Sequence, residues 1–574
     1  MIKEYSQNRS NVIMNFSIKY CSSSEELLNS FGFKKVLEKY IQSLEKKDTV
    51  LFDKITKTIQ RDSLSKTYIE LFRLLLSLDK RDVVKLNEQY RKILSQKDML
   101  FDLIEGLYSY WRSLERYALI QSKGSEQGIQ NVNFIEANNE FTNVVLKTYR
   151  RIEENILGME HNIYRQLSAG INAGLVLIPY ENKYFNYYEV LNGIQFIKSV
   201  VFTPPFVVYP KKSTRSGLFK EVYVNPIVDL PINQSHYFCY PAKVGESLAY
   251  VYFHRDFMNH GISLCNLFEL AKPEEYKNSE PDLIYVFGQR TKDKIKENVF
   301  YHDKEKDVYI GFAPSSDEID YFGYMKKMIL TLHNVRMIDR GHLPIHGAMV
   351  NVTLKNGKNA NIAIMGDSGA GKSESLEAFR TLSSKYLKEI KIIFDDMGVF
   401  KIENGKVYGY GTEVGAFVRL DDLADGYAFE AMDRGIFMNP HKTNARLLYP
   451  VSNYKDIMYG YKVDIFLYAN NYIDKKQVLR LIEDKDEAMT IFKKGTRKAK
   501  GTTSELGVID SYFANPFGVV QRKQQSEQII KRVFDVLYDT NVEVGEIYTK
   551  LAIEGYERKG PEKAAQKLFE WIMK

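Results

Sequence analysis

Apolar residues recur at helical spacing through most of the first 168 residues of the chain. One helix is predicted to begin at Ser22, because Ser22 and Glu25 have the spacing of a capping box. Similar helical patterns cover residues 67–78, 83–94, 99–120 and 141–167. Proline, which breaks helices, is absent from residues 1–178. The pattern therefore predicts an all-α domain over residues 1–168, with its apolar stripes packed as an ordinary bundle core.

The pattern changes near Gly170, where prolines appear and tyrosine and valine become dense. Runs such as residues 200–202 and 206–209 are typical of strands bounded by turns, and they predict an α+β domain over residues 169–310. From residue 311 onward, short apolar runs predict buried strands mixed with helices. These runs are residues 361–365, 390–394 and 463–468. We expect an α+β or α/β protein whose third domain covers residues 311–574.

The most specific motif is GDSGAGKS, which matches G-x-x-x-x-G-K-[ST] in full. Its residues are Gly366, Asp367, Ser368, Gly369, Ala370, Gly371, Lys372 and Ser373. A strand pattern precedes the motif and a helical pattern follows it, so the backbone N–H groups and the helix start are suited to a β-phosphate. Lys372 is predicted to contact β/γ oxygens, and the Ser373 hydroxyl to ligate Mg²⁺. We therefore predict an ATP site; a glycine-rich turn without a ligand is the alternative.

Asp395 and Asp396 follow the apolar run that comes after this loop. That is the position of a Walker-B-type carboxylate, where one acid holds a metal ion and a second polarises an attacking group. The alternative is a solvated pair of acids at the end of a strand. The preceding phosphate loop favours the metal-binding interpretation.

Further motifs appear in a fixed order around the loop. They are TRS at residues 214–216 with Lys220, YFGYMKK at 321–327, IHG at 345–347, EVGAFVR at 413–419, TNARLLYP at 443–450, the segment from Ala488 to Thr502, and FANPFG at 513–518. The loop, IHG and the two acids resemble HPr kinase/phosphorylase. The longer series, over roughly residues 200–525, resembles ATP-dependent phosphoenolpyruvate carboxykinase. The resemblance implies a carboxykinase-like mixed-sheet core with a P-loop, which the N-terminal helices precede.

The resemblance also implies a role for each matching residue. Lys327, His346 and Asp396 would hold a transition metal, normally Mn²⁺, so the lysine must be deprotonated. Lys326 and Tyr321 would face a three-carbon substrate, and Arg215 would bind its carboxylate. Arg446 would bridge the substrate and the γ-phosphoryl group, and Arg419 would replace a lysine at the phosphates. Asp395, with Ser373, would serve Mg²⁺.

Composition narrows the class of partner. The 574 residues include 80 Lys+Arg and 73 Asp+Glu, a mild excess of +7. The densest basic cluster, residues 493–500, follows a phosphate loop, so we expect it to attract a small anion and not nucleic acid. Three cysteines without a C-x-x-C pair fit a reducing cytoplasm. Without a signal peptide or an apolar run of about 20 residues, we expect a soluble cytoplasmic protein with no membrane partner.

Three functions are compatible with these observations, in this order of preference. The first is conversion of oxaloacetate and ATP to phosphoenolpyruvate, CO₂ and ADP. The second is phosphorylation of a hydroxyl on a protein or small molecule, because GDSGAGKS is closer to the HPr kinase loop; the N-terminal helices would then recruit a protein substrate. The third is an ATP-binding regulator without turnover, because residues 503–506 have no basic residue where the carboxykinases have an arginine near adenine.

Overall fold

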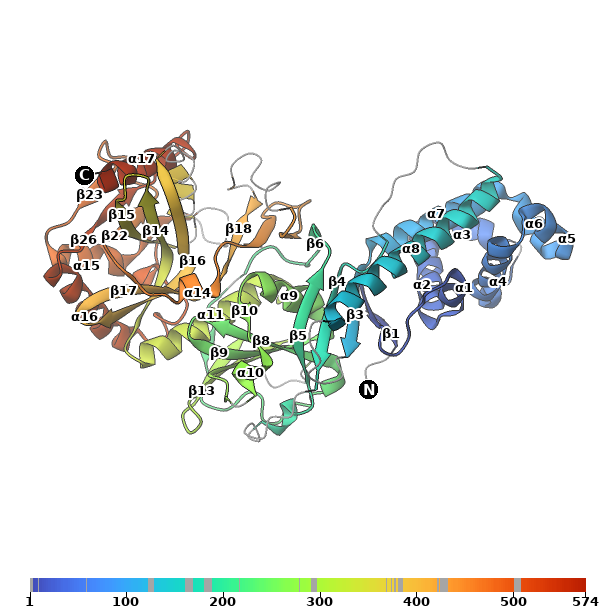
Figure 1. Cartoon of the computed structure of the whole chain (residues 1–574), viewed down its shortest axis with the longest axis horizontal. Helices are drawn as coiled ribbons and strands as arrows, with labels where there is room; N and C mark the ends of the chain where they lie inside the picture. Colours follow the sequence, from blue (N-terminus) through green and yellow to red (C-terminus); the bar gives the residue numbers. More distant parts are fainter. Residues whose placement is uncertain are drawn as a thin grey trace. The chain divides into compact units, whose positions relative to one another are not determined.

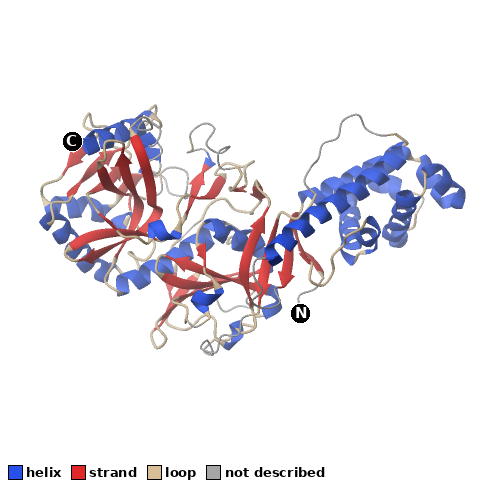
Figure 2. Cartoon of the chain, in the orientation of Figure 1, coloured by secondary structure: helices blue, strands red, loops and turns tan. Residues whose placement is uncertain are grey.

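The chain forms a mixed α/β structure (Figures 1 and 2). The computed structural model describes residues 4–8, 10–57, 59–121, 129–159, 169–179, 188–215, 217–277, 279–290, 297–367, 369–372, 374–375, 378–379, 386–420, 423, 432–499 and 507–573. Two compact units are present, an N-terminal unit of Met1–Ile178 with Ile197–Thr203 and a C-terminal unit of Pro179–Phe196 with Pro204–Lys574. The mixed α/β class is thus confirmed, whereas the division at residue 310 stays a prediction.

The N-terminal unit contains strands as well as helices. Its elements are β1 (Tyr5–Asn8), β2 (Asn11–Asn15), α1 (Ser24–Asn29), α2 (Phe31–Lys47), α3 (Thr49–Thr56), α4 (Leu64–Ser77), α5 (Lys80–Leu86), α6 (Glu88–Ser95), α7 (Lys97–Ser113), β3 (Glu115–Gln121), α8 (Ile129–Leu157) and β4 (Ala173–Ile178). β1 pairs with β2 in antiparallel fashion, and β2, β3 and β4 are parallel neighbours. The prediction of an all-α domain over residues 1–168 is therefore wrong.

The reason for this error lies in the apolar run at residues 115–121. Its residues Tyr117, Ala118 and Leu119 are completely buried, so the segment shows no polar face that would separate a strand from the end of a helix. The predicted helix over residues 99–120 in fact ends at Ser113, and the chain then enters β3. A second predicted helix, residues 83–94, is divided in two because the Asn87 side chain accepts a hydrogen bond from the Tyr90 amide at 2.7 Å and caps α6.

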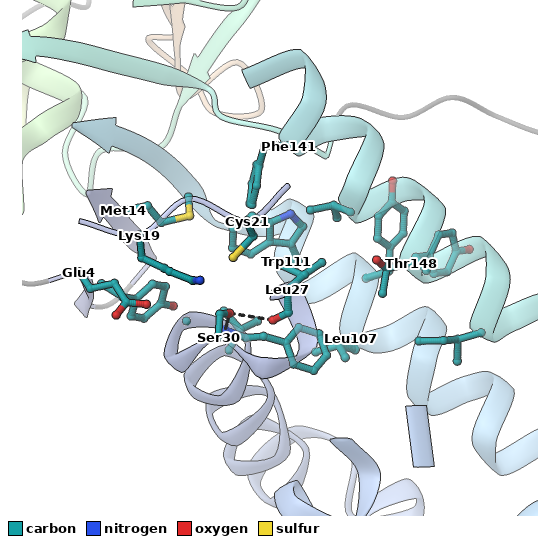
Figure 3. A pocket seen from close by; sticks show the side chains of 18 of the residues that line it. Glu4, Met14, Lys19, Cys21, Leu27, Ser30, Leu107, Trp111, Phe141 and Thr148 are labelled. Atoms are coloured by element: carbon teal, nitrogen blue, oxygen red, sulfur yellow. Dashed lines mark hydrogen bonds between the residues drawn. The ribbon is translucent and has the colours of Figure 1, made fainter. Parts of the chain in front are cut away.

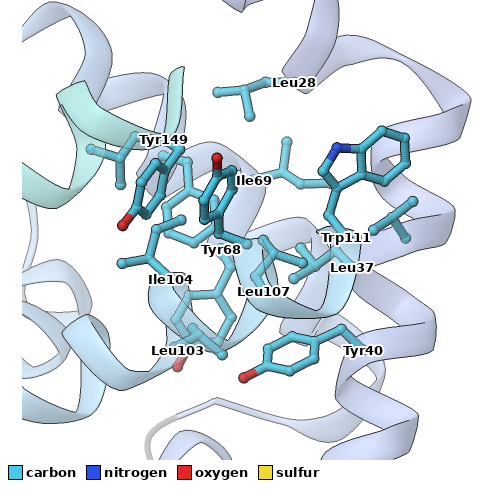
Figure 4. Close-up of a cluster of buried hydrophobic side chains, with 14 of the residues drawn as sticks. Leu28, Leu37, Tyr40, Tyr68, Ile69, Leu103, Ile104, Leu107, Trp111 and Tyr149 are labelled. Atoms are coloured by element: carbon cyan, nitrogen blue, oxygen red, sulfur yellow. The ribbon is translucent and has the colours of Figure 1, made fainter. Parts of the chain in front are cut away.

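Helices supply most of the N-terminal core (Figure 4). Leu37 from α2, Tyr68 from α4 and Leu107 from α7 belong to one buried apolar cluster. Side chains of α8 complete this cluster, among them Tyr149, whose ring stacks on Tyr108 at 4.0 Å between centroids. The predicted bundle core is thus present, beside the unpredicted strands.

The C-terminal unit has two large sheets. The first contains residues 195–196 of β5 (Gln195–Phe202), then β8 (Tyr237–Val244), β9 (Ser247–His254), β11 (Leu283–Gln289), β13 (Val308–Pro314), β12 (Val299–Asp303) and β7 (Lys220–Glu221) in hydrogen-bonded order, with β10 (Glu269–Leu270) on β8. Helices α9 (Met258–Ser263), α10 (Pro273–Tyr276) and α11 (Phe322–Asp339) accompany it. Helix α11 is buried along almost its whole length, which fixes the lysines in its first turns.

The second sheet carries the phosphate loop. Its order is β21 (Tyr461–Lys462), β17 (Lys406–Gly411), β16 (Leu387–Glu403), β14 (Leu343–Leu354), β15 (Asn359–Met365), β22 (Ile465–Asn470), β26 (Glu543–Tyr548) and β23 (Leu479–Leu481). In β15, Ile362 and Ile364 pack on one face with α17 (Lys559–Met573), while Ala363 and Met365 pack on the other with α16 (Lys523–Asp539). Both faces are covered, which explains the continuous apolar runs that predicted these strands.

One expectation about this sheet needs correction. The run at residues 390–394 was expected to end a strand at Asp395 and Asp396, but β16 continues to Glu403 and pairs with both β14 and β17. The acidic pair therefore lies inside the strand. Charge does not end the strand here because side chains from neighbouring elements pair with Asp396, as described below.

Smaller elements complete the C-terminal unit. They are a sheet of β18 (Gly415–Arg419), β20 (Arg446–Pro450), β19 (Ile436–Met438) and β6 (Phe206–Val208), a hairpin of β24 (Thr496–Lys498) and β25 (Val508–Asp510), and helices α14 (Tyr454–Ile457) and α15 (Lys485–Lys494). Among the helices of the described segments, none is long and apolar enough to cross a membrane.

Candidate active site

The phosphate loop follows β15 directly, as the sequence predicted. The Gly366 amide donates to the His346 carbonyl at 3.0 Å, so the loop starts beside the histidine on β14. Lys372, Glu374 and Ser375 are helical, and the Ser375 amide donates to Gly371 at 3.1 Å. The loop therefore lies between a buried strand and a helix start, the setting that suits an anion. Ser368 and Ser373 lie outside the described residues.

Side chains from neighbouring strands hold the loop in shape. Asn471 donates to the Gly369 carbonyl at 2.8 Å, and the Thr549 hydroxyl donates to the Ala370 carbonyl at 2.7 Å. Gly371 has a φ of +89°, and a Cβ there would lie 2.6 Å from the Thr549 hydroxyl oxygen. These contacts fix two loop carbonyls on the β22 and β26 side, while the Ala370 amide donates to the Asp367 carbonyl within the loop at 3.1 Å.

Asp367 and Lys372 are both buried in this loop. The Asp367 carboxylate accepts a hydrogen bond from Nε of the buried Arg497 at 2.9 Å, and its other oxygen lies 3.5 Å from Nδ1 of His346. The Lys372 ammonium donates to the Asp367 carbonyl at 3.2 Å. The loop lysine thus lies within the loop, and Asp367 connects the loop to the β24–β25 hairpin.

The centre of the site is the Asp396 carboxylate, which three cationic or basic side chains approach. One oxygen lies 2.8 Å from the Lys326 ammonium and 2.5 Å from that of Lys327. The other oxygen lies 2.9 Å from Nε2 of His346. The lysines come from α11, the histidine from β14 and the acid from β16. Separate elements thus bring together the three predicted metal ligands.

Glu413 lies beside this cluster and is a residue whose role was not predicted. Its carboxylate is within 3.2 Å of the Lys326 ammonium, and both side chains are almost completely buried. Burial raises the pKa of Glu413 to about 7, although Lys326 opposes this. Burial disfavours a charged Lys326, but Asp396 and Glu413 together raise its pKa above the ordinary value. Lys326 is therefore cationic at neutral pH.

The pKa values of Lys327 and His346 shift in the opposite direction to that of Lys326. Burial lowers the pKa of Lys327 to about 8, with Asp396 acting in the opposite direction, and burial lowers the pKa of His346. Nδ1 of His346 lies 2.7 Å from the Ala514 carbonyl oxygen, which only accepts, so Nδ1 carries the proton. The Nε2 lone pair of the neutral ring then faces the Asp396 carboxylate. Two electron-rich atoms at this distance need a cation or a proton between them.

These side chains fit a divalent metal ion. Lys327 can lose its proton near neutral pH, His346 presents an unprotonated nitrogen, and despite burial its cationic neighbours hold the pKa of Asp396 well below its usual range. Nitrogen and carboxylate ligands together suit a transition metal. In the described segments, no group of three or more His, Cys, Asp or Glu side chains forms a metal site. The candidate site uses a lysine as its third ligand.

Two arginines lie on the small sheet that contains β18 and β20. Arg419 and Arg446 are directly opposite each other on β18 and β20, so their side chains share one face. Nε of Arg446 is buried and has no hydrogen-bond partner among the described residues. Like charges at directly opposite positions destabilise a sheet. An anion between them would remove this cost.

Two phenylalanines connect the predicted substrate residues to the metal ligands. The Phe417 ring lies 5.9 Å from the Lys326 ammonium, 5.4 Å from the Arg446 guanidinium carbon and 6.1 Å from the Tyr321 ring. The Phe517 ring lies 4.7 Å from the Lys327 ammonium and 4.8 Å from the Arg215 guanidinium carbon. Tyr321, Arg446 and Arg215 are therefore close to the lysine pair. Asp395 is half-buried next to Asp396 in β16.

Sequence reasoning missed several residues that organise the site. Arg497 was interpreted only as part of a basic cluster, but this cluster is largely ion-paired: Arg497 with Asp367, Lys493 with Glu527 and Lys494 with Asp510. Asn471 and Thr549 follow buried strands at the loop, and that position was their only signal. Glu413 and Phe417 were part of a matched motif without an assigned role.

A search with models of known protein families found none that matches this chain. A search of curated protein sequences also found no match.

Proposed function

We propose that the chain is an ATP-dependent, phosphoenolpyruvate carboxykinase-like phosphotransferase of oxaloacetate. The observation that carries this proposal is the convergence of Lys326, Lys327 and His346 on the Asp396 carboxylate beside the phosphate loop. An ordinary hydroxyl kinase has no need of a mostly buried lysine whose pKa is lowered to about 8 next to a second lysine whose pKa is raised. ATP is the proposed phosphoryl donor, with Mg²⁺ and Mn²⁺ as the metal ions.

The proposed reaction has two steps. The bond between the β-carboxylate of oxaloacetate and its neighbouring carbon breaks, CO₂ leaves, and the electron pair forms an enolate. The enolate oxygen then forms a bond to the γ-phosphorus of ATP, the bond to the β–γ bridging oxygen breaks, and ADP leaves. Negative charge therefore develops first on the enolate oxygen and then on the transferring phosphoryl group.

The residues of the site are placed to stabilise both charges. Lys326, cationic and buried, provides a fixed positive charge for the enolate oxygen. Arg446 and Arg419 provide charge for the phosphoryl group, and Lys372 holds the β/γ oxygens. Arg215, next to Phe517, binds the remaining carboxylate. A divalent cation held by Lys327, His346 and Asp396 would act as a Lewis acid toward the substrate oxygens.

The test is formation of phosphoenolpyruvate by the purified chain from oxaloacetate and ATP with Mg²⁺ and Mn²⁺. We expect product with the wild type and with Lys388→Ala, a control at an exposed lysine of β16. We expect none with Lys372→Ala or Lys326→Ala. Absence of product from a wild type that still binds ATP would refute the carboxykinase proposal.

A second candidate is a kinase of a hydroxyl group. The observation that favours it is the His346–Asp396 pair, a base and a carboxylate at 2.9 Å beside the phosphate loop, which would take a proton from a hydroxyl. In the same assay, ATP hydrolysis that depends on His346 without phosphoenolpyruvate formation would favour this candidate. ATP binding without any turnover would favour a regulatory role, and absence of ATP binding would exclude all three.

A further inference from the structure

A cavity of about 110 Å³ lies inside the N-terminal unit (Figure 3). The residues that line it are far in the sequence from those of the proposed reaction. Side chains of β1, β2, α1, α2, α7 and α8 line it. Protein interiors seldom leave voids larger than a water molecule. An apolar cavity of roughly 150 Å³ is known to bind benzene. The cavity in the N-terminal unit can therefore hold an apolar group of about six carbon atoms.

The wall of the cavity is apolar and rich in aromatic rings. Leu107 and Trp111 of α7 and Phe141 of α8 line it. Thr148 adds no polarity because its hydroxyl donates to the Val144 carbonyl of its own helix at 2.7 Å. Burial raises the pKa of the Cys21 thiol, so this side chain is a neutral part of the wall. The interior therefore suits an apolar group without hydrogen-bonding atoms.

The cavity has one polar end, formed by Glu4, Lys19 and Ser30. The Ser30 hydroxyl is already engaged, since it donates to the Leu27 carbonyl at 2.8 Å and accepts from the Phe33 amide at 3.0 Å. The Lys19 ammonium has no hydrogen-bond or ion-pair partner in the described part of the chain, and Figure 3 shows its side chain extending toward the Cys21 and Ser30 side of the cavity.

Charged groups of both signs lie near the apolar wall at this end. Lys19 lowers the pKa of the Cys21 thiol more than either Glu26 or Glu4 raises it, so the ammonium has the largest single charge effect there. A single negative charge on a ligand would be attracted by Lys19, whereas a second would be repelled by Glu4. A ligand amine would be repelled by Lys19.

We propose that this cavity binds a small amphipathic monocarboxylate, with an apolar body of about six carbons inside and its carboxylate at Lys19. The site is independent of the proposed phosphotransfer reaction. It gives the N-terminal unit a ligand-binding role that the sequence did not reveal.

Trp111 provides the readout for a direct test. The chain has two tryptophans, so Trp571→Phe leaves Trp111, which lines the cavity, as the only one. Hexanoate, hexanol and hexylamine would be titrated into the full-length Trp571→Phe protein at constant ionic strength. We expect a saturable change in Trp111 fluorescence, with hexanoate binding about tenfold or more tightly than hexanol and hexylamine binding most weakly.

Variants separate the charge from the cavity. Lys19→Ala should remove the preference for hexanoate over hexanol, while Lys92→Ala, at an exposed lysine of α6, should keep it. Val145→Phe should abolish binding by filling the cavity, and the milder Val145→Leu should weaken it; thermal unfolding checks that each variant is folded. Equal affinity for hexanol and hexanoate, unchanged hexanoate binding in Lys19→Ala, or no saturable binding of any probe would overturn the proposal.

Discussion

The two units both bury charged side chains, but they satisfy them in different ways. In the N-terminal unit, Arg116 is almost completely buried, and it donates to the carbonyls of Gly170, Trp111, Arg112 and Leu114. Burial lowers the pKa of Arg116 to about 10, but its partners are backbone groups that cannot titrate. In the C-terminal unit, Asp396 is satisfied by side chains that can lose or gain protons.

This difference separates a buried charge with a structural role from a charge whose partners can exchange protons or bind a metal ion. Backbone carbonyls from two chain segments, residues 111–114 and Gly170, surround Arg116 and offer nothing to a ligand. Around Asp396, two of the three partners, Lys327 and His346, can each present a lone pair to a metal ion. Perturbed side chains clustered on several elements are typical of functional sites. The following changes test whether the contrast between the two interiors holds.

The largest effect is expected from Asp396→Asn. It leaves the two lysines without their common carboxylate, and loss of one partner from a buried ion pair costs about 3–5 kcal/mol. We therefore expect a lower urea midpoint and a loss of about 10³-fold or more in phosphoenolpyruvate formation. Asp486→Asn, at an exposed acid of α15, is the control and should change neither quantity. An unchanged urea midpoint in Asp396→Asn would contradict the role of Asp396 as the common partner.

Arg446→Gln should separate activity from stability. The change removes a cation from the proposed path of the phosphoryl group, and we expect kcat/KM to fall by about 10²–10³-fold. Without ATP, the free energy of unfolding should stay the same or rise by about 0.2–1 kcal/mol, because repulsion from Arg419 is lost. Steady-state kinetics and urea unfolding check the two expectations. A large loss of stability would show that Arg446 has a structural role like that of Arg116.

Leu71→Ala tests the N-terminal interior in the same way. Leu71 is completely buried in the apolar cluster of this unit. Truncation of such a leucine costs about 2–5 kcal/mol, through lost transfer free energy and the remaining cavity. We expect faster hydrogen exchange in α4, measured by mass spectrometry, and unchanged ATP affinity. A matching loss of ATP affinity would mean that the phosphate loop depends on the N-terminal core.

The pH dependence of stability should come mainly from the C-terminal unit. Eight of the nine histidines lie in it, and the ninth, His161, is outside the described residues. Burial lowers the pKa of His333 to about 4. The unfolded chain therefore takes up a proton on this histidine below about pH 6.5, whereas the folded protein does so only near pH 4. Its contribution to stability is full above pH 6.5 and is lost as the pH falls.

The loss should amount to about 2 kcal/mol between pH 6.5 and pH 5, at about 1.4 kcal/mol for each pH unit. Urea unfolding over this range would measure it. His333→Leu should reduce the slope by this amount, while His441→Leu, at an exposed position, should not. Identical slopes for the wild type and His333→Leu would refute the assignment.

The sequence predicted which residues lie together better than it predicted the fold around them. The phosphate loop, the lysine pair, His346 and Asp396 all have short, specific patterns, and the structure brings them together. Strand β3 was missed because its residues are buried on both faces and have no period that separates strand from helix. Arg497, Asn471 and Glu413 act through partners that are distant in sequence, and such pairing becomes visible only in the folded chain.

The smallest effect is expected from Asn471→Ala, which sharpens the question of how the loop is held. Asn471 is completely buried; it donates to the carbonyls of Gly369 at 2.8 Å and Lys498 at 2.9 Å, and it accepts from the Lys498 amide at 2.9 Å. Each lost hydrogen bond costs about 1 kcal/mol, so we expect ATP affinity to fall by about 10- to 30-fold.

This prediction depends on which state of the loop Asn471 stabilises. If Asn471 fixes the loop in its phosphate-binding shape, calorimetric titration with ATP should show a weaker Kd, while the urea midpoint changes little. If it mainly connects the loop to the β24–β25 hairpin as a structural contact, the urea midpoint should fall and the Kd of the remaining folded protein should stay the same. The second result would give Asn471 a structural role like that of Arg116. The groups proposed to act in the reaction would then be limited to the cluster around Asp396.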